Sequence, residues 1–196
     1  MAKNRNYVKY NFVEQKLLKM ITTMLLTIGM SLFISLLVLN AKLPTKIQYV
    51  EEVTINAPIH SIYDAVRYQE QLMAWSAWPK ATKSQCAVKN VDGKLGAQTV
   101  YLKNGKQFGY QEVTDLQDNE KVSFYLTSKA PFEQDTRLHF YFQERDNNNT
   151  NVMLYFDNTL KRPSHIFPHI LGIIKWTHGM HLKDLAGLKK YVENKA

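Results

Sequence analysis

The apolar positions of the chain are most concentrated near its N-terminus. Residues 20–39 read MITTMLLTIGMSLFISLLVL and include no charged side chain. A helix needs about 20 apolar residues to cross the hydrocarbon core of a bilayer. A buried helix of a soluble core would normally have one polar face, whereas this run has only scattered Thr and Ser. The pattern therefore predicts a transmembrane helix over residues 20–41.

A cleavable signal peptide is the main alternative to a permanent anchor. Leu39, Asn40 and Ala41 faintly resemble the small-residue site at which signal peptides are cleaved. Leu is a poor residue at such a site, and the apolar run exceeds the roughly 7 to 15 residues of a signal-peptide core. The basic segment before the run is also long. We therefore expect the helix to be retained as an anchor.

Basic residues on either side of the span predict its orientation. Residues 1–19 form a basic segment with five Lys or Arg, whereas only Lys42 and Lys46 follow shortly after the span. Because basic flanks stay on the cytoplasmic side, we expect a cytoplasmic N-terminus and an exported C-terminal part. In a bacterium that part would lie in the periplasm or at the outer surface.

Three hydroxyl side chains share one face of the predicted span. Thr27, Ser31 and Ser35 recur every fourth residue, a pattern of small residues that lets two membrane helices approach closely and form a dimer. The alternative is that each hydroxyl bonds to the backbone carbonyl one turn earlier and has no role between helices.

After a linker at residues 42–46, the pattern becomes that of strands and short amphipathic helices. Residues 47–55 have the length and β-branched content of a strand. Apolar positions from 59 to 75 recur every three or four residues, as in one or two short helices. Six further runs rich in Val, Tyr, Phe and Thr follow, separated by plausible turns. They cover residues 84–90, 97–103, 107–116, 121–128, 132–145 and 151–160.

The last part of the chain is predicted to be helical. After Pro163 an apolar stripe with helical spacing continues to the C-terminus, and Pro168 should interrupt or start the helix. The order of elements is then strand, short helices, an antiparallel meander and one long helix. This order predicts a single α+β domain over residues 47–196, with an antiparallel sheet curled around the C-terminal helix.

The charge and the cysteine content of the chain bear on which classes of function are possible. The formal charge of +8 would suit nucleic-acid binding, but about half of the excess lies before the span and no run of Lys and Arg interleaved with aromatics is present. We therefore expect no nucleic-acid partner. The lone Cys86 cannot form an internal disulfide, so the chain gives no indication of a redox compartment.

Several short motifs resemble those of the SRPBCC superfamily, which includes START lipid-transfer domains, the birch-pollen allergen group and polyketide cyclase/dehydratase-like proteins. Ala57-Pro58 followed by Tyr63 resembles the opening of the first helix in this superfamily. The sequence WSAWP at 75–79 resembles the segment that closes the second helix. Residues 93–101 resemble a conserved hairpin, and residues 182–193 resemble the end of the long helix. Together these motifs span nearly all of the chain from residue 47 onward.

The resemblance implies a helix-grip fold, in which the sheet wraps around the last helix and a cavity between them takes an apolar small molecule or lipid. No cofactor is implied. The residues that we expect to line such a cavity are Tyr63, Trp75, Tyr110, Phe124, Phe140, Phe142, Leu154, Phe156, Ile170, Ile174 and His181. Aromatic and aliphatic side chains line most ligand pockets, but alternating aromatics also fill ordinary sheet cores.

Catalytic and metal-binding motifs are missing from the sequence. His165 with His169, and His178 with His181, have helical spacing, but a metal site needs three or four converging ligands, and we expect none here. There is no GxSxG, no glycine-rich phosphate loop and no HExxH. A general acid or base inside the cavity is the remaining option, for which the candidates are Glu112, Asp157, His139 and His181.

The sequence favours two classes of function and leaves a third as a less favoured alternative. A membrane-anchored, noncatalytic carrier or binding domain for a lipid-like molecule agrees best with the anchor and the expected cavity. A cyclase- or dehydratase-like enzyme would need only one or two positioned titratable groups. A structural or partner-binding role in the cell envelope is the third.

Overall fold

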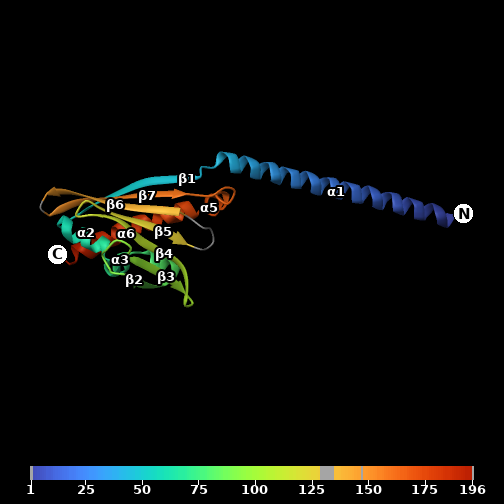
Figure 1. The fold of residues 1–196 in the computed structure, drawn as a ribbon. Helices are drawn as coiled ribbons and strands as arrows, with labels where there is room; N and C mark the ends of the chain where they lie inside the picture. Colours follow the sequence, from blue (N-terminus) through green and yellow to red (C-terminus); the bar gives the residue numbers. More distant parts are fainter. Residues whose placement is uncertain (1, 129–134, 147, 196) are drawn as a thin grey trace. The chain divides into compact units, whose positions relative to one another are not determined.

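The computed structural model describes residues 2–128, 135–146 and 148–195, in two compact units, 1–43 and 44–196. The first unit is the helix α1 (Ala2–Lys42) (Figure 1). Its segment Glu14–Lys42 is long and apolar enough to be a candidate membrane span. Within it, Thr27 donates to the Met24 carbonyl and Ser35 to the Ser31 carbonyl, each at 2.8 Å. These are the local bonds that membrane-helix hydroxyls commonly make.

The second unit is built on a seven-stranded antiparallel sheet, with the strand order β1-β7-β6-β5-β4-β3-β2. All of its strands were predicted from the sequence, with ends that differ by a few residues. The first residues of the predicted strand 132–145 lie outside the described part of the chain. The strands are β1 (Lys46–Ile55), β2 (Gln85–Lys89), β3 (Gln98–Lys103), β4 (Lys106–Gln117), β5 (Lys121–Ser128), β6 (Asp135–Asp146) and β7 (Asn149–Thr159).

The register of the strands defines two ends of this sheet. Lys46 pairs with Thr159 where β1 begins and β7 ends. Across the neighbouring strands, Thr136 pairs with Leu126, and Ser128 pairs with Gly109. We call this end of the sheet the Lys46 end. The opposite end holds the close of β1, from which the chain passes directly into the short helices.

Three short helices follow β1: α2 (Ile59–Arg67), α3 (Gln69–Trp75) and α4 (Trp78–Thr82). The first two were expected, whereas α4 was not. The joint between α2 and α3 is Tyr68, which has an extended backbone and therefore ends α2. The Asp92 carboxylate then accepts the backbone N–H groups of Gln69 and Glu70 at 2.6 and 3.2 Å. A carboxylate at the N-terminus of a helix accepts from the free N–H groups and interacts favourably with the helix dipole.

The C-terminal helical region is divided in two, α5 (Ile166–Ile170) and α6 (Ile173–Glu193). The division falls at Gly172, not at Pro168. Gly172 has φ of +68°, a left-handed conformation that costs a glycine little and other residues more. Pro168 lies early in α5, where its missing N–H would have no partner in the helix anyway.

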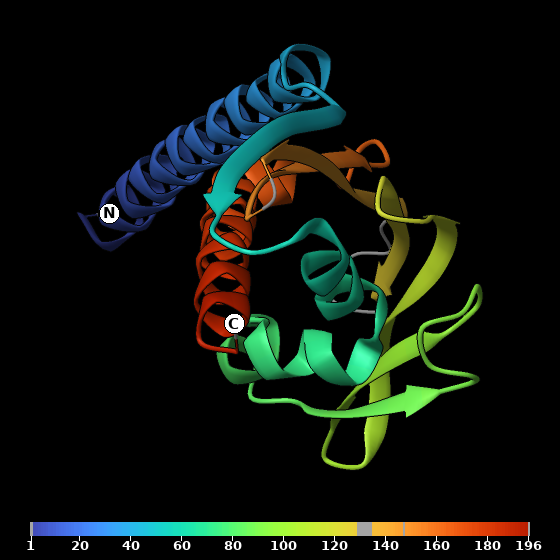
Figure 2. The same cartoon turned by 90° about the vertical axis from the view of Figure 1, so that its left-hand side faces the viewer.

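The sheet curls around α6 (Figure 2). The helices α2 and α3 lie beside α6, on the concave side of the sheet. This arrangement is the predicted α+β helix-grip fold. The buried core lies between these three helices and the inner face of the sheet. Its largest fully buried apolar members are Phe124, Phe140, Ile55, Ile62, Leu154 and Leu188.

Candidate ligand cavity

A cavity of about 340 Å³ lies between α6 and the Lys46 end of the sheet. Its size falls within the range of small-molecule sites. Strands β3 to β7 supply most of its wall, α6 one side, and α4 another. The lining residues are Trp78, Thr82, Tyr101, Phe108, Gly109, Tyr110, Leu126, Thr127, Ser128, Thr136, Phe156, Ile173, Trp176, Thr177 and His181.

The helix α6 presents one face to this cavity. Ile173, Trp176, Thr177 and His181 are three or four residues apart and therefore share a helix face. The Trp176 ring packs edge-on against the Trp78 ring of α4, with centroids 5.2 Å apart. The wall is thus aromatic where the two helices meet. Within the described part of the chain, none of the lining residues is an Asp, Glu, Lys or Arg.

His181 is a buried titratable residue in the cavity wall. It is only 1% exposed, and its Nδ1 lies 2.8 Å from the Tyr49 hydroxyl of β1. Its ring packs against Phe156 with centroids 4.9 Å apart. Burial, and secondly the neighbouring His178, lower the pKa of His181 to about 4. The imidazole is therefore neutral at pH 7. Its ring nitrogens make it a polar but uncharged group at the cavity wall.

Asp184 is buried one helical turn after His181 and is not a lining residue. One of its oxygens accepts the Ala77 backbone N–H at 2.7 Å and the Ser76 hydroxyl at 3.2 Å. Burial raises the pKa of Asp184 to about 6, although these hydrogen bonds act in the opposite direction. The carboxyl group thereby fixes α6 to the link between α3 and α4, which positions Trp78 against the cavity.

Two tyrosines near the cavity, Tyr49 and Tyr101, have raised pKa values. Burial raises the pKa of Tyr49, with a smaller contribution from Glu51. Burial likewise raises the pKa of Tyr101. Both phenols are therefore protonated at pH 7 and act as hydroxyl groups, not as anions.

The predicted lining residues separate into groups. Tyr110, Phe156 and His181 line the cavity. Ile174 lines a much smaller pocket beside it, which Phe156 also borders. Ile170 lies in α5, 62% exposed, outside both pockets. The other predicted residues belong to the buried core, where Tyr63 of α2 and Trp75 of α3 pack against the rings of the sheet. They are Tyr63, Trp75, Phe124, Phe140, Phe142 and Leu154.

Several lining residues were not among those predicted. Trp78 was assigned to a structural motif, and α4, which presents it, was not expected. Ile173 and Trp176 could have been found, because this part of the helix is apolar on more faces than packing on a sheet requires. The lining threonines have no comparable signal, since Thr is common at any strand position.

The other candidate acid-base groups lie away from the cavity. His139 bonds to the Ser123 hydroxyl at 2.7 Å, Asp157 lies 3.8 Å from the Lys46 ammonium, and Glu112 accepts from the Gln98 amide at 2.7 Å. None of the three lines the cavity. Among the residues that the structure describes, no group of three or more His, Cys, Asp or Glu is placed to hold a metal ion.

A family-model match, together with the shared fold, places the protein in the SRPBCC superfamily. The family model described as Activator of Hsp90 ATPase homolog 1-like protein matches residues 56–170, more than half of the chain. The chain belongs to this family. A comparison with curated protein sequences finds no match.

Solved structures from distant proteins share this fold. A protein from Nitrosospira multiformis is 12% identical with a TM-score of 0.55, over 74% of this chain and 94% of that one. One from Chromobacterium violaceum is 15% identical with a TM-score of 0.53, over 77% and 99%. Norcoclaurine synthase from Thalictrum flavum, in complex with a transition state analogue, is 10% identical with a TM-score of 0.58, over 77% and 97%. At these identities the likeness concerns the fold alone.

Proposed function

We propose that this protein is a membrane-anchored binding domain or carrier for an apolar or amphipathic small molecule of the lipid class. The observation that carries the proposal is the cavity at the Lys46 end, which has an aromatic wall and, among the residues that the structure describes, no charged lining residue. Apolar pockets with a few placed polar groups are typical ligand sites. Here the polar groups are hydroxyls and the neutral His181, which suit a hydroxyl, carbonyl or protonated acid on an otherwise apolar ligand.

The anchor in this proposal is the span within Glu14–Lys42, and its orientation follows from the basic N-terminal segment. Residues 1–19 would be cytoplasmic and residues 44–196 exported. A reporter enzyme that is active only outside the cytoplasm, fused after Ala196, should then be active, and the full-length chain should be retained in membranes. An inactive fusion would contradict the orientation, and a mature chain starting near Lys42 would contradict the anchor.

A variant that fills the cavity tests the binding role. Thr177 borders both the cavity and the smaller pocket, so Thr177→Trp would place an indole in the space assigned to the ligand. Ala186→Trp is the matched control, because Ala186 is an exposed residue of the same helix, outside both pockets. Both variants add the same ring to α6, and only the first should interfere with binding.

The assay uses the unit 44–196 with a fluorescent fatty acid or sterol analogue. The wild-type and Ala186→Trp proteins should bind the probe, and Thr177→Trp should lose most of this binding while keeping its melting temperature. Mass spectrometry of lipid extracts from the wild-type protein would identify any molecule that co-purifies. If neither wild-type nor control takes up a probe and no lipid co-purifies, the carrier role fails and a partner-binding role becomes the stronger candidate.

A cyclase- or dehydratase-like reaction is the second candidate, because His181 is a titratable group at the cavity wall. A general base works best when its pKa lies near the working pH. With a pKa of about 4, His181 is a weak base, which favours the carrier role. A histidine NMR titration distinguishes the two: a His181 pKa between 6 and 7 would favour the enzyme.

A further inference from the structure

An exposed apolar surface lies where α5 meets α6, outside the core of the domain. Its residues are Phe167, Ile170, Leu171 and Trp176, which are 52%, 62%, 65% and 48% exposed. We call this surface the α5–α6 corner. Four large apolar side chains exposed within ten residues are unusual on a soluble surface and indicate an interaction site.

The chain enters the domain at this same corner. The His169 ring of α5 donates from Nε2 to the Pro44 carbonyl at 2.9 Å, and Leu160, just before α5, donates its N–H to the Thr45 carbonyl at 2.8 Å. Pro44 is two residues after Lys42, the last residue of the candidate span. Two residues reach at most about 7 Å. If the span crosses a bilayer, α5 is therefore held near the surface of that bilayer.

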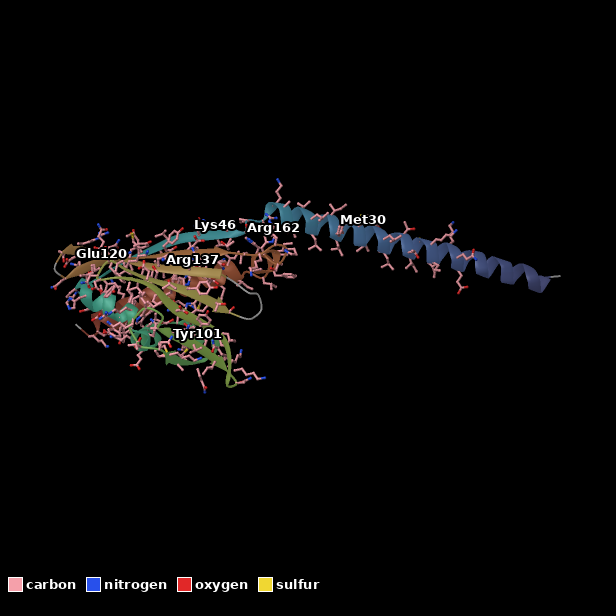
Figure 3. All side chains as sticks on the ribbon, viewed as in Figure 1. Met30, Lys46, Tyr101, Glu120, Arg137 and Arg162 are labelled. Carbon is pink, nitrogen blue, oxygen red and sulfur yellow. The ribbon has the colours of Figure 1, made fainter. Side chains whose placement is uncertain are left out.

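The charge around the corner also suits a bilayer with anionic lipids. From Leu160 to Lys183 the sequence contains no Asp or Glu, but it carries Lys161, Arg162, Lys175 and Lys183. Figure 3 shows Lys46 and Arg162 at one end of the domain and Glu120 at the opposite end. The Lys46 ammonium lies 3.8 Å from the Asp157 carboxylate, so Arg162 is the stronger cation of this pair for lipid phosphates. Aromatic residues interspersed with basic ones are typical of segments that lie in the headgroup region, where rings enter the interface and cations meet lipid phosphates.

The corner is continuous with the cavity. Trp176 belongs to both, since it is half exposed and also lines the cavity beside Ile173 and Thr177. The strand positions that line the cavity, including Gly109, Ser128 and Thr136, belong to the Lys46 end of the sheet. The rim of the cavity and the point where the chain enters the domain thus lie at the same end.

From these observations we infer that the α5–α6 corner rests on the surface of the bilayer that anchors the chain, so that the cavity exchanges its ligand directly with the membrane. The inference rests on the proposed membrane anchor. It assigns the bilayer, and not a partner protein, as the occupant of the corner. It also identifies the ligand as a molecule that resides in the membrane.

The test measures lipid contact at single labelled positions of the full-length protein in vesicles that contain anionic lipid. In a Cys86→Ser background, an environment-sensitive fluorophore is attached after Leu171→Cys, Leu95→Cys or Leu32→Cys. Leu171 and Leu95 are 65% and 64% exposed and are thus matched. Leu95, however, lies in the turn between β2 and β3, at the end of the sheet opposite Lys46. Leu32 lies within the candidate span and reports on insertion. Brominated lipids quench a label that touches the bilayer.

We expect strong quenching at Leu32 and Leu171 and little at Leu95. Quenching at Leu32 without quenching at Leu171 would overturn the inference and leave the anchor intact, and a partner protein would then be the better occupant. Equal quenching at Leu171 and Leu95 would also overturn it, because the contact would not be specific to the corner. If Leu32 is not quenched, the proposed anchor fails and the inference fails with it.

Discussion

The two ends of the curled sheet carry similar side chains on their inner face, yet one end is filled and the other is hollow. Away from the Lys46 end, the rings of Phe124 and Phe140 pack edge-on with centroids 6.1 Å apart, and Trp75 packs edge-on against Phe140 at 6.3 Å. At the Lys46 end, Phe156 and Tyr110 face a cavity of about 340 Å³.

The helices that cover each end account for this difference. At the filled end, α2 and α3 insert Ile62, Tyr63 and Trp75 between the sheet and α6, and the Trp75 indole N–H donates to the Ala65 carbonyl at 2.8 Å. At the hollow end, α6 meets the sheet without such a layer. The comparison teaches that alternating aromatics mark the inner face of a sheet, and that the covering helices decide whether this face is filled core or the wall of a cavity.

The largest contrast between the two ends should appear when a Trp is removed from each. Trp75→Ala should destabilise the domain by about 3 to 5 kcal/mol, because it removes a buried ring from the filled end. Trp176→Ala should cost about 1 kcal/mol, since Trp176 is 48% exposed and loses mainly its contact with Trp78. In thermal denaturation of residues 44–196, the first variant should melt about 10 °C lower or more. Equal losses would contradict the distinction between the ends.

The pH dependence of stability should distinguish His181, at the cavity, from Asp184, at the junction with the filled end. Between pH 4 and 6.5, His181 is neutral in the folded state and protonated in the unfolded state. The unfolded state then binds more protons, so this group's contribution to the free energy of unfolding falls as the pH falls. Asp184 behaves in the opposite way. Between pH 3.8 and 6 it is protonated only in the folded state, so its contribution falls as the pH rises.

Two substitutions separate the opposing contributions of His181 and Asp184 to the free energy of unfolding. Each contribution amounts to about 3 kcal/mol at most. Relative to wild type, His181→Phe should gain stability as the pH falls from 6.5 to 4. Asp184→Asn, which keeps an oxygen to accept from Ala77, should gain relative stability as the pH rises from 4 to 6. Urea denaturation across this range measures both. Variant curves that run parallel to the wild-type curve would contradict the perturbed pKa values.

The smallest expected effects on stability concern two glycines of α6, one packed against α3 and the other in open space. A Cβ at Gly187 would collide with the Trp75 carbonyl oxygen, whereas a Cβ at Gly179 would meet nothing within 4 Å. Gly187→Ala should therefore destabilise the domain by about 1 to 3 kcal/mol through overpacking. Gly179→Ala should stabilise it by about 0.5 to 1 kcal/mol, because alanine favours a helix. Urea denaturation checks both, and a stabilising Gly187→Ala would mean that α6 and α3 pack less closely than described.

The sequence by itself determined the order of the elements and the class of the fold. Alternation along the strands and three- to four-residue spacing along the helices depend only on which side chains face the core, so they can be read without coordinates. The charge-free run at residues 20–39 is a local property of the same kind, as are the motifs around Trp75 and Gly93. For this reason the seven strands and a sheet curled around the last helix could be predicted, and the resemblance of the motifs implied the helix-grip fold.

Only the tertiary structure decided which inner-face residues line a cavity. Phe140 and Phe156 occupy equivalent alternating positions on adjacent strands, but Phe140 is covered by Trp75 of α3 and Phe156 faces open space beside His181. The break at Gly172 directs α5 away from α6 and leaves Ile170 on the surface. Burial, pKa and cavity shape depend on contacts between residues distant in sequence. A pattern along one chain does not contain that information.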